Sequence, residues 1–143
     1  MKVSIIIPFF NASATIRRCI ESAISQTYKN IEVICINNNS DDDSLSILQT
    51  YLDKHDHIFL YTELRKGANF ARNLGTKKST GIWISYLDAD DYLHEKKIED
   101  QVKAIEKNGG YPFLVAPSYV VDLFGNKKKH PKMSFETHHD GAF

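Results

Sequence analysis

Two short runs of mainly β-branched, apolar residues constrain the fold of this chain more than any other feature. The first covers residues 3–7 and is closed by Pro8, and the second covers residues 31–36. A strand with one solvated face alternates apolar and polar residues, whereas a strand covered on both faces is apolar almost throughout. The two runs therefore predict central strands of a parallel sheet, buried on both sides.

Segments with a helical period of apolar residues separate these runs from further strand-like segments at residues 58–61 and 81–87. We expect helices to begin near residues 13, 41, 67 and 93. Asn11 or Ser13 is the predicted cap of the first helix, and residues 41–43 place acid in the first turn of the second. This alternation predicts an α/β fold with three layers, α/β/α, around a mostly parallel sheet.

The fourth predicted strand, at residues 81–87, is apolar and aromatic, which indicates burial, and it ends in the carboxylates of Asp88, Asp90 and Asp91. Like charges this close repel one another unless a cation or hydrogen bonds compensate. Mg²⁺ or Mn²⁺ would do so, because hard divalent cations take carboxylate oxygens and share them with substrate phosphates. The alternative is that Asp90 and Asp91 only cap the following helix.

Polar residues also follow the first two strands, and parallel sheets bind ligands beyond the carboxyl ends of their strands. No Gly-x-Gly-x-x-Gly follows the first strand, which argues against a nicotinamide or flavin site. For Phe9 and Phe10, stacking on a base and packing beneath the rim both stay open. The three asparagines at residues 37–39 either read a nucleobase edge or form a turn.

Lys66, Arg72 and Asn73 lie on the third predicted helix or just before it, where a cation at the rim would meet phosphate. The alternative for each is a solvated helix face. His138, His139 and Asp140 suggest either a metal site or a surface loop. The surface loop is favoured, because adjacent residues seldom face one ion together.

The composition bounds the class of protein. A length of 143 residues suits one domain, and 18 basic residues balance 18 acidic ones, so net charge gives no argument for nucleic acid. Cys19 and Cys35 are too few for a disulfide scaffold, which weakly favours a cytoplasmic protein. No apolar run reaches the length of a membrane span.

Four motifs occur in the order and spacing of a known family. They are VSIIIPFFN at residues 3–11, EVICINNNS at 32–40, GANFARNLG at 67–75 and LDADD at 87–91. Together they resemble the family 2 glycosyltransferases of the GT-A fold. The resemblance implies a Rossmann-like GT-A domain that binds a nucleotide sugar at residues 1–125. Residues 126–143 would be the start of an acceptor-side region or an irregular tail.

The resemblance also implies an activity. A sugar would pass from a nucleotide donor, most often a UDP-sugar, to a saccharide or lipid-linked acceptor in cell-surface polysaccharide synthesis, with inversion and with Mg²⁺ or Mn²⁺ at the diphosphate. Such a protein is cytoplasmic, and a lipid-linked acceptor would bring it to the inner membrane face. The implied donor-binding residues are Pro8, Phe10, Asn11, Asn38, Lys66, Arg72, Asn73, Asp88, Ala89 and Asp90. Asp88 is assigned to the ribose and the metal site, Asp90 to the metal, and Asp91 to the helix start.

By the same resemblance, Pro8 and Phe10 border the base, and the residue at position 38 forms a hydrogen bond with uracil. Most relatives carry Asp at that position, whereas this chain has Asn38. An amide oxygen still accepts from the uracil imide, but the amide NH₂ is equally compatible with a different base edge.

The family's general base is an Asp or Glu that lies well after the Asp-x-Asp motif. After residue 125 the chain contains only the carboxylates of Glu136 and Asp140, and neither lies in a recognisable motif. We therefore expect the base beyond Phe143 and the fold to be incomplete. The alternative function is a nucleotide-sugar-binding fragment without turnover. A phosphohydrolase that uses Asp88 and Asp90 ranks last, since no Thr follows shortly after Asp90.

Overall fold

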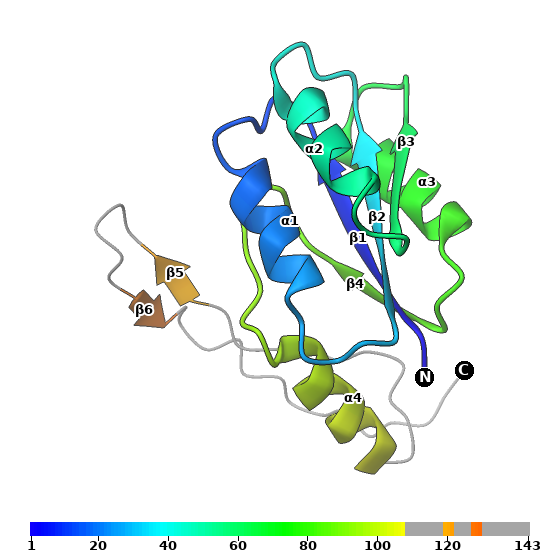
Figure 1. Ribbon diagram of the computed structural model, residues 1–143, viewed down its shortest axis with the longest axis vertical. Coiled ribbons are helices and arrows are strands. Elements are labelled where there is room, and N and C mark those ends of the chain that lie inside the picture. Colours follow the sequence, from blue (N-terminus) through cyan, green and yellow to red (C-terminus); the bar gives the residue numbers. More distant parts are fainter. Residues whose placement is uncertain (108–118, 122–126, 130–143) are drawn as a thin grey trace, which may run out of the picture.

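The computed structural model of the protein describes residues 1–107, 119–121 and 127–129 (Figure 1). Strands and helices alternate through residue 107. The elements are β1 (Val3–Phe9), α1 (Ile16–Ile24), β2 (Ile31–Asn37), α2 (Ser44–Leu52), β3 (Ile58–Thr62), α3 (Ala68–Lys78), β4 (Trp83–Tyr86), α4 (Lys97–Lys107), β5 (Tyr119–Val121) and β6 (Lys127–Lys129).

The first four strands form one parallel sheet in the order β3-β2-β1-β4. The strands predicted from the two apolar runs are thus its central members, and every described residue of β1 and β2 is buried. Because all four strands run in one direction, their carboxyl ends lie along one edge of the sheet, which we call the rim. The predicted α/β fold with a mostly parallel sheet is confirmed.

Helices cover both faces of this sheet (Figure 1). On one face, Ile5, Ile7 and other odd-numbered residues of β1 share a core with buried residues of α1 and α2. On the other face, Ile6 packs with Ala71 of α3. Gly75 lets α3 approach closely, because a Cβ there would lie 2.4 Å from Ile6 Cγ2. The continuous apolar runs are therefore explained by two cores, one on each side of the sheet.

Two predicted helix starts are wrong. Helix α1 is capped by Thr15, not by Asn11 or Ser13, and α2 begins at Ser44, after residues 41–43. The reason is tertiary: Asp42 accepts a hydrogen bond from the Ser13 backbone N–H at 2.9 Å, so these polar residues tie the loops after β1 and β2 together. Asp42 also accepts from the Ser44 N–H at 3.0 Å, so it serves both the joint between the loops and the start of α2.

The predicted burial of the fourth strand is also wrong. Strand β4 pairs with β1 and is the edge of the sheet within the described residues. Trp83, Ile84 and Ser85 are half-buried, and Tyr86 is 48% exposed. An edge position leaves one side of a strand without a neighbour, so an aromatic sequence alone does not indicate burial.

The last described elements, β5 and β6, pair in antiparallel orientation. Strand β6 shows that Lys127–Lys129 are not irregular. The two strands lie on either side of the predicted boundary between residues 125 and 126, and the division into two domains stays a prediction. His138, His139 and Asp140 lie outside the described residues. Among the helices described here, none has the length and apolar character needed to cross a membrane.

Candidate functional site

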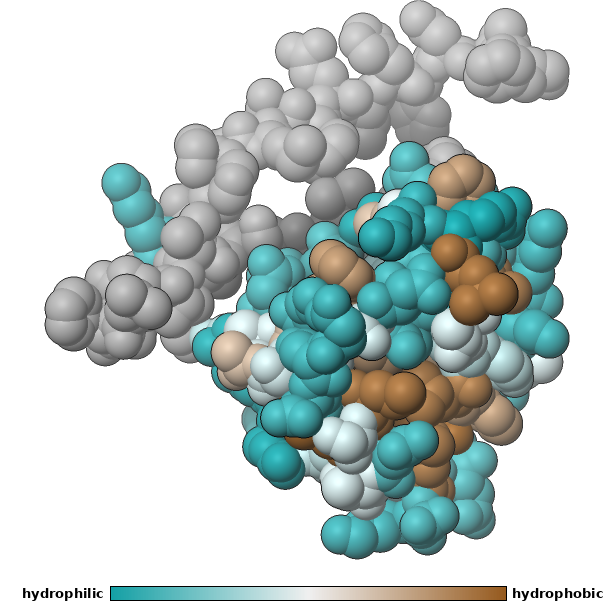
Figure 2. Space-filling view, turned by 90° about the horizontal axis from the view of Figure 1, so that it is seen from above, coloured by the Kyte–Doolittle hydropathy of each residue, from teal (hydrophilic) through white to brown (hydrophobic). Residues whose placement is uncertain are grey.

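A pocket of about 670 Å³ opens at the rim, where β1, β2 and β4 end and α3 begins. All predicted donor-binding residues except Asn73 line it, together with Phe9, Ala12, Ala14, Thr15, Gly67 and Ala68. Figure 2 views the molecule from the rim end and shows an apolar area bordered by hydrophilic residues. A pocket of this size, apolar with a few convergent polar groups, is typical of a small-molecule site.

The exit of β1 provides the aromatic wall of the pocket. Phe9 is 2% exposed and belongs to the core, whereas Phe10 is 54% exposed. The two interpretations left open by the sequence are therefore divided between the two residues. Phe9 packs beneath the rim, and Phe10 presents a ring that a planar base can contact.

Asn11 joins the loops after β1 and β2. Its Nδ2 donates to Asp41 Oδ1 at 2.6 Å, and its Oδ1 accepts from the Asp41 backbone N–H at 3.0 Å. Its φ of 46° lies in the left-handed region, which asparagine tolerates better than most residues. The amide of Asn11 is thus engaged with Asp41, and this residue supports the pocket wall through its loop.

Two of the carboxylates that follow the fourth strand, those of Asp88 and Asp90, also line the pocket. Asp88 forms an ion pair with Arg72, with Oδ1 and Nη2 2.6 Å apart. Within the described residues, the Asp90 carboxylate has no hydrogen-bond or ion-pair partner, while its backbone oxygen accepts from Arg18 Nη2 at 3.0 Å. Asp90 therefore presents a carboxylate to the pocket that forms no ion pair within the described residues.

Asp91 does not cap a helix, because α4 begins only at Lys97. The helix-capping interpretation of Asp90 and Asp91 is wrong for that reason, and Asp91 has no place at a helix start. Burial, followed by the negative charges of Asp90 and Asp88, raises the pKa of the Asp91 carboxyl. The three carboxylates at positions 88, 90 and 91 thus concentrate negative charge after β4.

The residues present fit a divalent cation that is shared with a ligand. Asp88 and Asp90 line one pocket and offer oxygen ligands, which suit Mg²⁺ or Mn²⁺. Across the part of the chain that the structure describes, no three His, Cys, Asp or Glu side chains form a complete metal cage. Such a cation would accordingly take its remaining ligands from phosphate and water.

Two cationic residues line the same pocket. Lys66 precedes α3 and is exposed, whereas Arg72 lies on α3 and is half-buried against Asp88. Asn73, the next residue on α3, is exposed and does not line the pocket. The structure thus brings positive and negative groups to the same pocket as the exposed Phe10.

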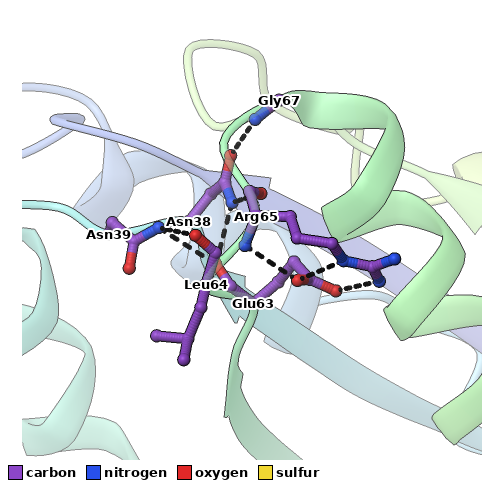
Figure 3. Close-up of polar contacts among 6 residues, drawn as sticks. All are labelled: Asn38, Asn39, Glu63, Leu64, Arg65 and Gly67. Carbon is purple, nitrogen blue, oxygen red and sulfur yellow. Dashed lines mark hydrogen bonds and ion pairs between the residues drawn. The ribbon is translucent and has the colours of Figure 1, made fainter.

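Asn38 follows β2 and is 6% exposed. Its side-chain amide is held by the segment of residues 63–67, which follows β3 (Figure 3). The sequence did not reveal these partners, nor the contact of Arg18 with Asp90. In each case the partners are far apart in the chain, and no local pattern signals the contact.

The fold has counterparts among solved structures. The crystal structure of a TarS fragment from S. aureus in complex with UDP matches 76% of this chain and 33% of that chain, at 25% identity and a TM-score of 0.71. A mannosyltransferase from Pyrobaculum calidifontis, in complex with GDP-Man and Mn²⁺, matches 71% of this chain and 31% of its own, at 24% identity and a TM-score of 0.67. The domain therefore has the GT-A fold of glycosyltransferases.

The sequence model described as "Glycosyl transferase family 2" matches residues 4–141. This chain belongs to that family. A UDP-Glc:alpha-D-GlcNAc-diphosphoundecaprenol beta-1,3-glucosyltransferase of Escherichia coli is 42% identical over 73% of this chain and 41% of its own length. An uncharacterized glycosyltransferase of Haemophilus influenzae is 35% identical over 89% of this chain and 51% of its own. The chain spans about half the length of these relatives or less.

Proposed function

We propose that this chain binds a nucleotide-sugar donor for transfer of the sugar to a saccharide or lipid-linked acceptor. The observation that carries the proposal is the mixed lining of the rim pocket. The exposed aromatic ring of Phe10 lines the same pocket as the charged side chains of Asp88, Asp90, Arg72 and Lys66. A nucleoside diphosphate offers matching groups, a planar base and a charged diphosphate.

The residues take separate roles in this proposal. Pro8 and Phe10 border the base, and Asp88 contacts the ribose. Lys66 and Arg72 face phosphate oxygens, which the planar guanidinium of Arg72 binds through paired hydrogen bonds. Asn73 has no role in the pocket as described, so its assignment rests on the resemblance alone.

Asp90, together with Asp88, would hold Mg²⁺ or Mn²⁺. When bound, the cation supplies positive charge that stabilises the departing nucleoside diphosphate. The support is the Asp90 carboxylate, which faces the pocket without a cationic partner among the described residues. We assign the general base to no residue of this chain, and we propose inversion from the family resemblance.

We propose that the nucleotide of the donor is UDP and that the transfer contributes to a cell-surface polysaccharide. The E. coli relative is named for UDP-Glc and for a diphosphoundecaprenol acceptor, and the TarS fragment was crystallised with UDP. The three amide residues at 37–39 are a feature of this chain's own sequence, so the base needs a direct test.

Calorimetric titration with UDP, GDP, CDP and ADP in the presence of Mn²⁺ tests the proposal. We expect UDP to bind most tightly and each nucleotide to bind more weakly after chelation of the metal. Equal or absent binding of all four nucleotides would contradict it. Release of nucleoside diphosphate from UDP-sugars, measured over time, separates transfer or donor hydrolysis from binding without turnover.

A further inference from the structure

Asn38 uses nearly all of its hydrogen-bonding capacity on one segment of backbone. Its Nδ2 donates to the carbonyl oxygens of Glu63 at 2.9 Å and of Arg65 at 2.7 Å. Its Oδ1 accepts from the backbone N–H of Gly67 at 2.7 Å. Figure 3 shows the amide enclosed by this segment, with each group directed at a backbone atom. An asparagine amide has two N–H donors, so none remains for a ligand.

Asn39 contributes to the same attachment. Its Nδ2 donates to the carbonyl oxygen of Leu64 at 2.8 Å and contacts that of Glu63 at 3.3 Å. Before it, the backbone oxygen of Asn37 accepts from the Glu63 N–H at 2.9 Å. We call the side chains of Asn38 and Asn39, with their bonds to residues 63–67, the amide clamp. Attachment of a neighbouring loop thus explains Asn38 and Asn39, whereas the Asn37 side chain forms a local turn, in which its Oδ1 accepts from the Ser40 N–H at 2.9 Å.

The segment held by the clamp leads directly into the pocket. Lys66 and Gly67 line the pocket, and α3, which carries Arg72, begins at the next residue. Gly67 has a φ of 131°, a conformation that favours glycine, so its N–H reaches Asn38 from a backbone that other residues adopt only with strain. The position of the clamp therefore determines where the segment that carries Lys66 and Arg72 enters the pocket.

The segment also has internal bonds that do not involve the clamp. Glu63, which is 7% exposed, accepts from Arg65 Nε at 2.9 Å and from Nη2 at 2.7 Å. The Arg65 guanidinium in turn lies 4.7 Å from the centre of the Phe70 ring. These contacts keep residues 63–65 compact, while within the described residues the Gly67 N–H is bonded by Asn38 alone.

The clamp requires an amide. A carboxylate at position 38 has no N–H to donate, and one of its oxygens would face the carbonyl oxygens of Glu63 and Arg65 at about the distance of the present hydrogen bonds. Such an arrangement removes two hydrogen bonds and adds electrostatic repulsion. With both N–H groups engaged, Asn38 can offer a ligand only the second lone pair of Oδ1, so it cannot select a base edge through its NH₂.

From these contacts we infer that Asn38 is a positioning residue. By fastening residues 63–67, it positions Lys66 and the start of α3 at the donor pocket. The site of this chain therefore depends on an amide at position 38. The inference deepens the proposed function and rests on it, because the pocket that Asn38 shapes is the one proposed for the nucleotide sugar.

The first test measures the loop without any nucleotide. Trypsin cleaves after Arg65 and Lys66, which are exposed and lie within the clamped segment. We expect Asn38→Asp to raise the initial rate of cleavage at these two bonds by at least about tenfold, since loss of even one of its two donated hydrogen bonds changes an opening equilibrium by about that factor. Asn30→Asp, which makes the same change of charge at an exposed site on the opposite end of the sheet, should behave like the parent protein.

The second test separates positioning from base recognition. Asn38→Ala removes the Asn38 bonds of the clamp without adding charge. If Asn38 acts through the loop, this variant loses affinity for UDP and for inorganic pyrophosphate by a similar factor, about tenfold. A loss confined to UDP would overturn the inference, because it would show that Asn38 reads the base. Parent-like cleavage after Arg65 and Lys66 in both variants would overturn it as well.

A measurement on the parent protein covers the case in which a variant fails to fold. Amide hydrogen exchange should be slower at Gly67 than at Lys66, because only the Gly67 N–H is held by Asn38. Free exchange at Gly67 would contradict the inference. If the parent binds no nucleotide while Gly67 is protected and the loop opens in Asn38→Asp, the proposed function fails and the clamp remains.

Discussion

Glu32 is the charged residue within the second apolar run, and its partners explain why the run tolerates it. The side chain is 3% exposed and accepts hydrogen bonds from Ser4 Oγ at 2.6 Å and from the Thr80 N–H at 2.6 Å. Lys2 Nζ lies 2.7 Å from its Oε2. These contacts join β1, β2 and the turn before β4 at the end of the sheet opposite the rim.

We expect Glu32→Gln to destabilise the fold by about 2 kcal/mol at neutral pH. Burial would raise the pKa of Glu32, but hydrogen bonds from Lys2, Ser4 and Thr80 outweigh it and lower the pKa to about 2 from 4.5. A depressed pKa gives stability above pH 4.5 that is lost as the pH falls towards 2. Urea unfolding across this range should show a flatter pH dependence in Glu32→Gln, whereas Glu106→Gln, an exposed control on α4, should follow the parent.

Asp90→Ala should abolish Mn²⁺-dependent nucleotide binding and leave the fold intact. The exposed Asp90 carboxylate has no ion-pair partner among the described residues, so its loss costs little stability while it removes a proposed metal ligand. Calorimetry with UDP and Mn²⁺ measures the effect, and Asp56→Ala, at an exposed site in the loop before β3, is the matched control. Equal affinity in Asp90→Ala and the parent would refute the metal assignment.

At the scale of residues, the sequence predicted which residues line the pocket. It predicted the contacts of their side chains less well. The motif positions predicted Pro8, Asp88 and Asp90 at the rim because each lies at or just after the carboxyl end of a parallel strand. The hydrogen bonds of Asn11 and Asn38 were missed, because their partners lie 25 or more residues away and depend on how neighbouring loops meet. The period and spacing of apolar residues indicate on which face of an element a residue lies. They do not indicate which distant residue it contacts.

At the scale of elements, the apolar period predicted the strands and helices through α4, and boundaries at the rim were less accurate. The apolar face of α1 includes Ile16, Cys19, Ile20 and Ala23, which recur at the three- and four-residue spacing of a helix. Its start was misplaced, because loop contacts and not local capping hold residues 11–13. The edge position of β4 likewise depends on which strands pair, which no single segment encodes.

Gly75→Ala should displace α3 from the sheet. The added Cβ would lie 2.4 Å from Ile6 Cγ2, which is closer than side chains pack, and Ile6 lies in the centre of the sheet. We expect a loss of about 1–3 kcal/mol from overpacking, together with weaker UDP binding because Arg72 lies on the same helix. Chemical unfolding and calorimetry measure the two effects. Lys77→Ala, at an exposed position of α3, should change stability by no more than about 0.5 kcal/mol.

At the scale of the whole molecule, the sheet brings together loops that are far apart in the chain. The pocket is lined by residues after β1, β2 and β4 and by the start of α3, and the loops are joined by side-chain bonds such as that of Asn11 to Asp41. A ligand that spans the pocket contacts several of these segments at once. Its binding should therefore stabilise the domain as a unit, and not one loop alone.

This linkage predicts a cooperative thermal shift. At a UDP concentration of about one hundred times its Kd in Mn²⁺, the domain should gain about 2.7 kcal/mol, which for a chain of this size corresponds to a rise in Tm of about 5–10 °C. Chelation of Mn²⁺ should remove most of the shift, since the diphosphate would then meet Asp88 and Asp90 without a cation between them. Scanning calorimetry with UDP alone, Mn²⁺ alone and both together measures the coupling. An equal shift from UDP with and without Mn²⁺ would exclude a metal bridge and leave nucleotide binding in place, whereas no shift in either condition would exclude both.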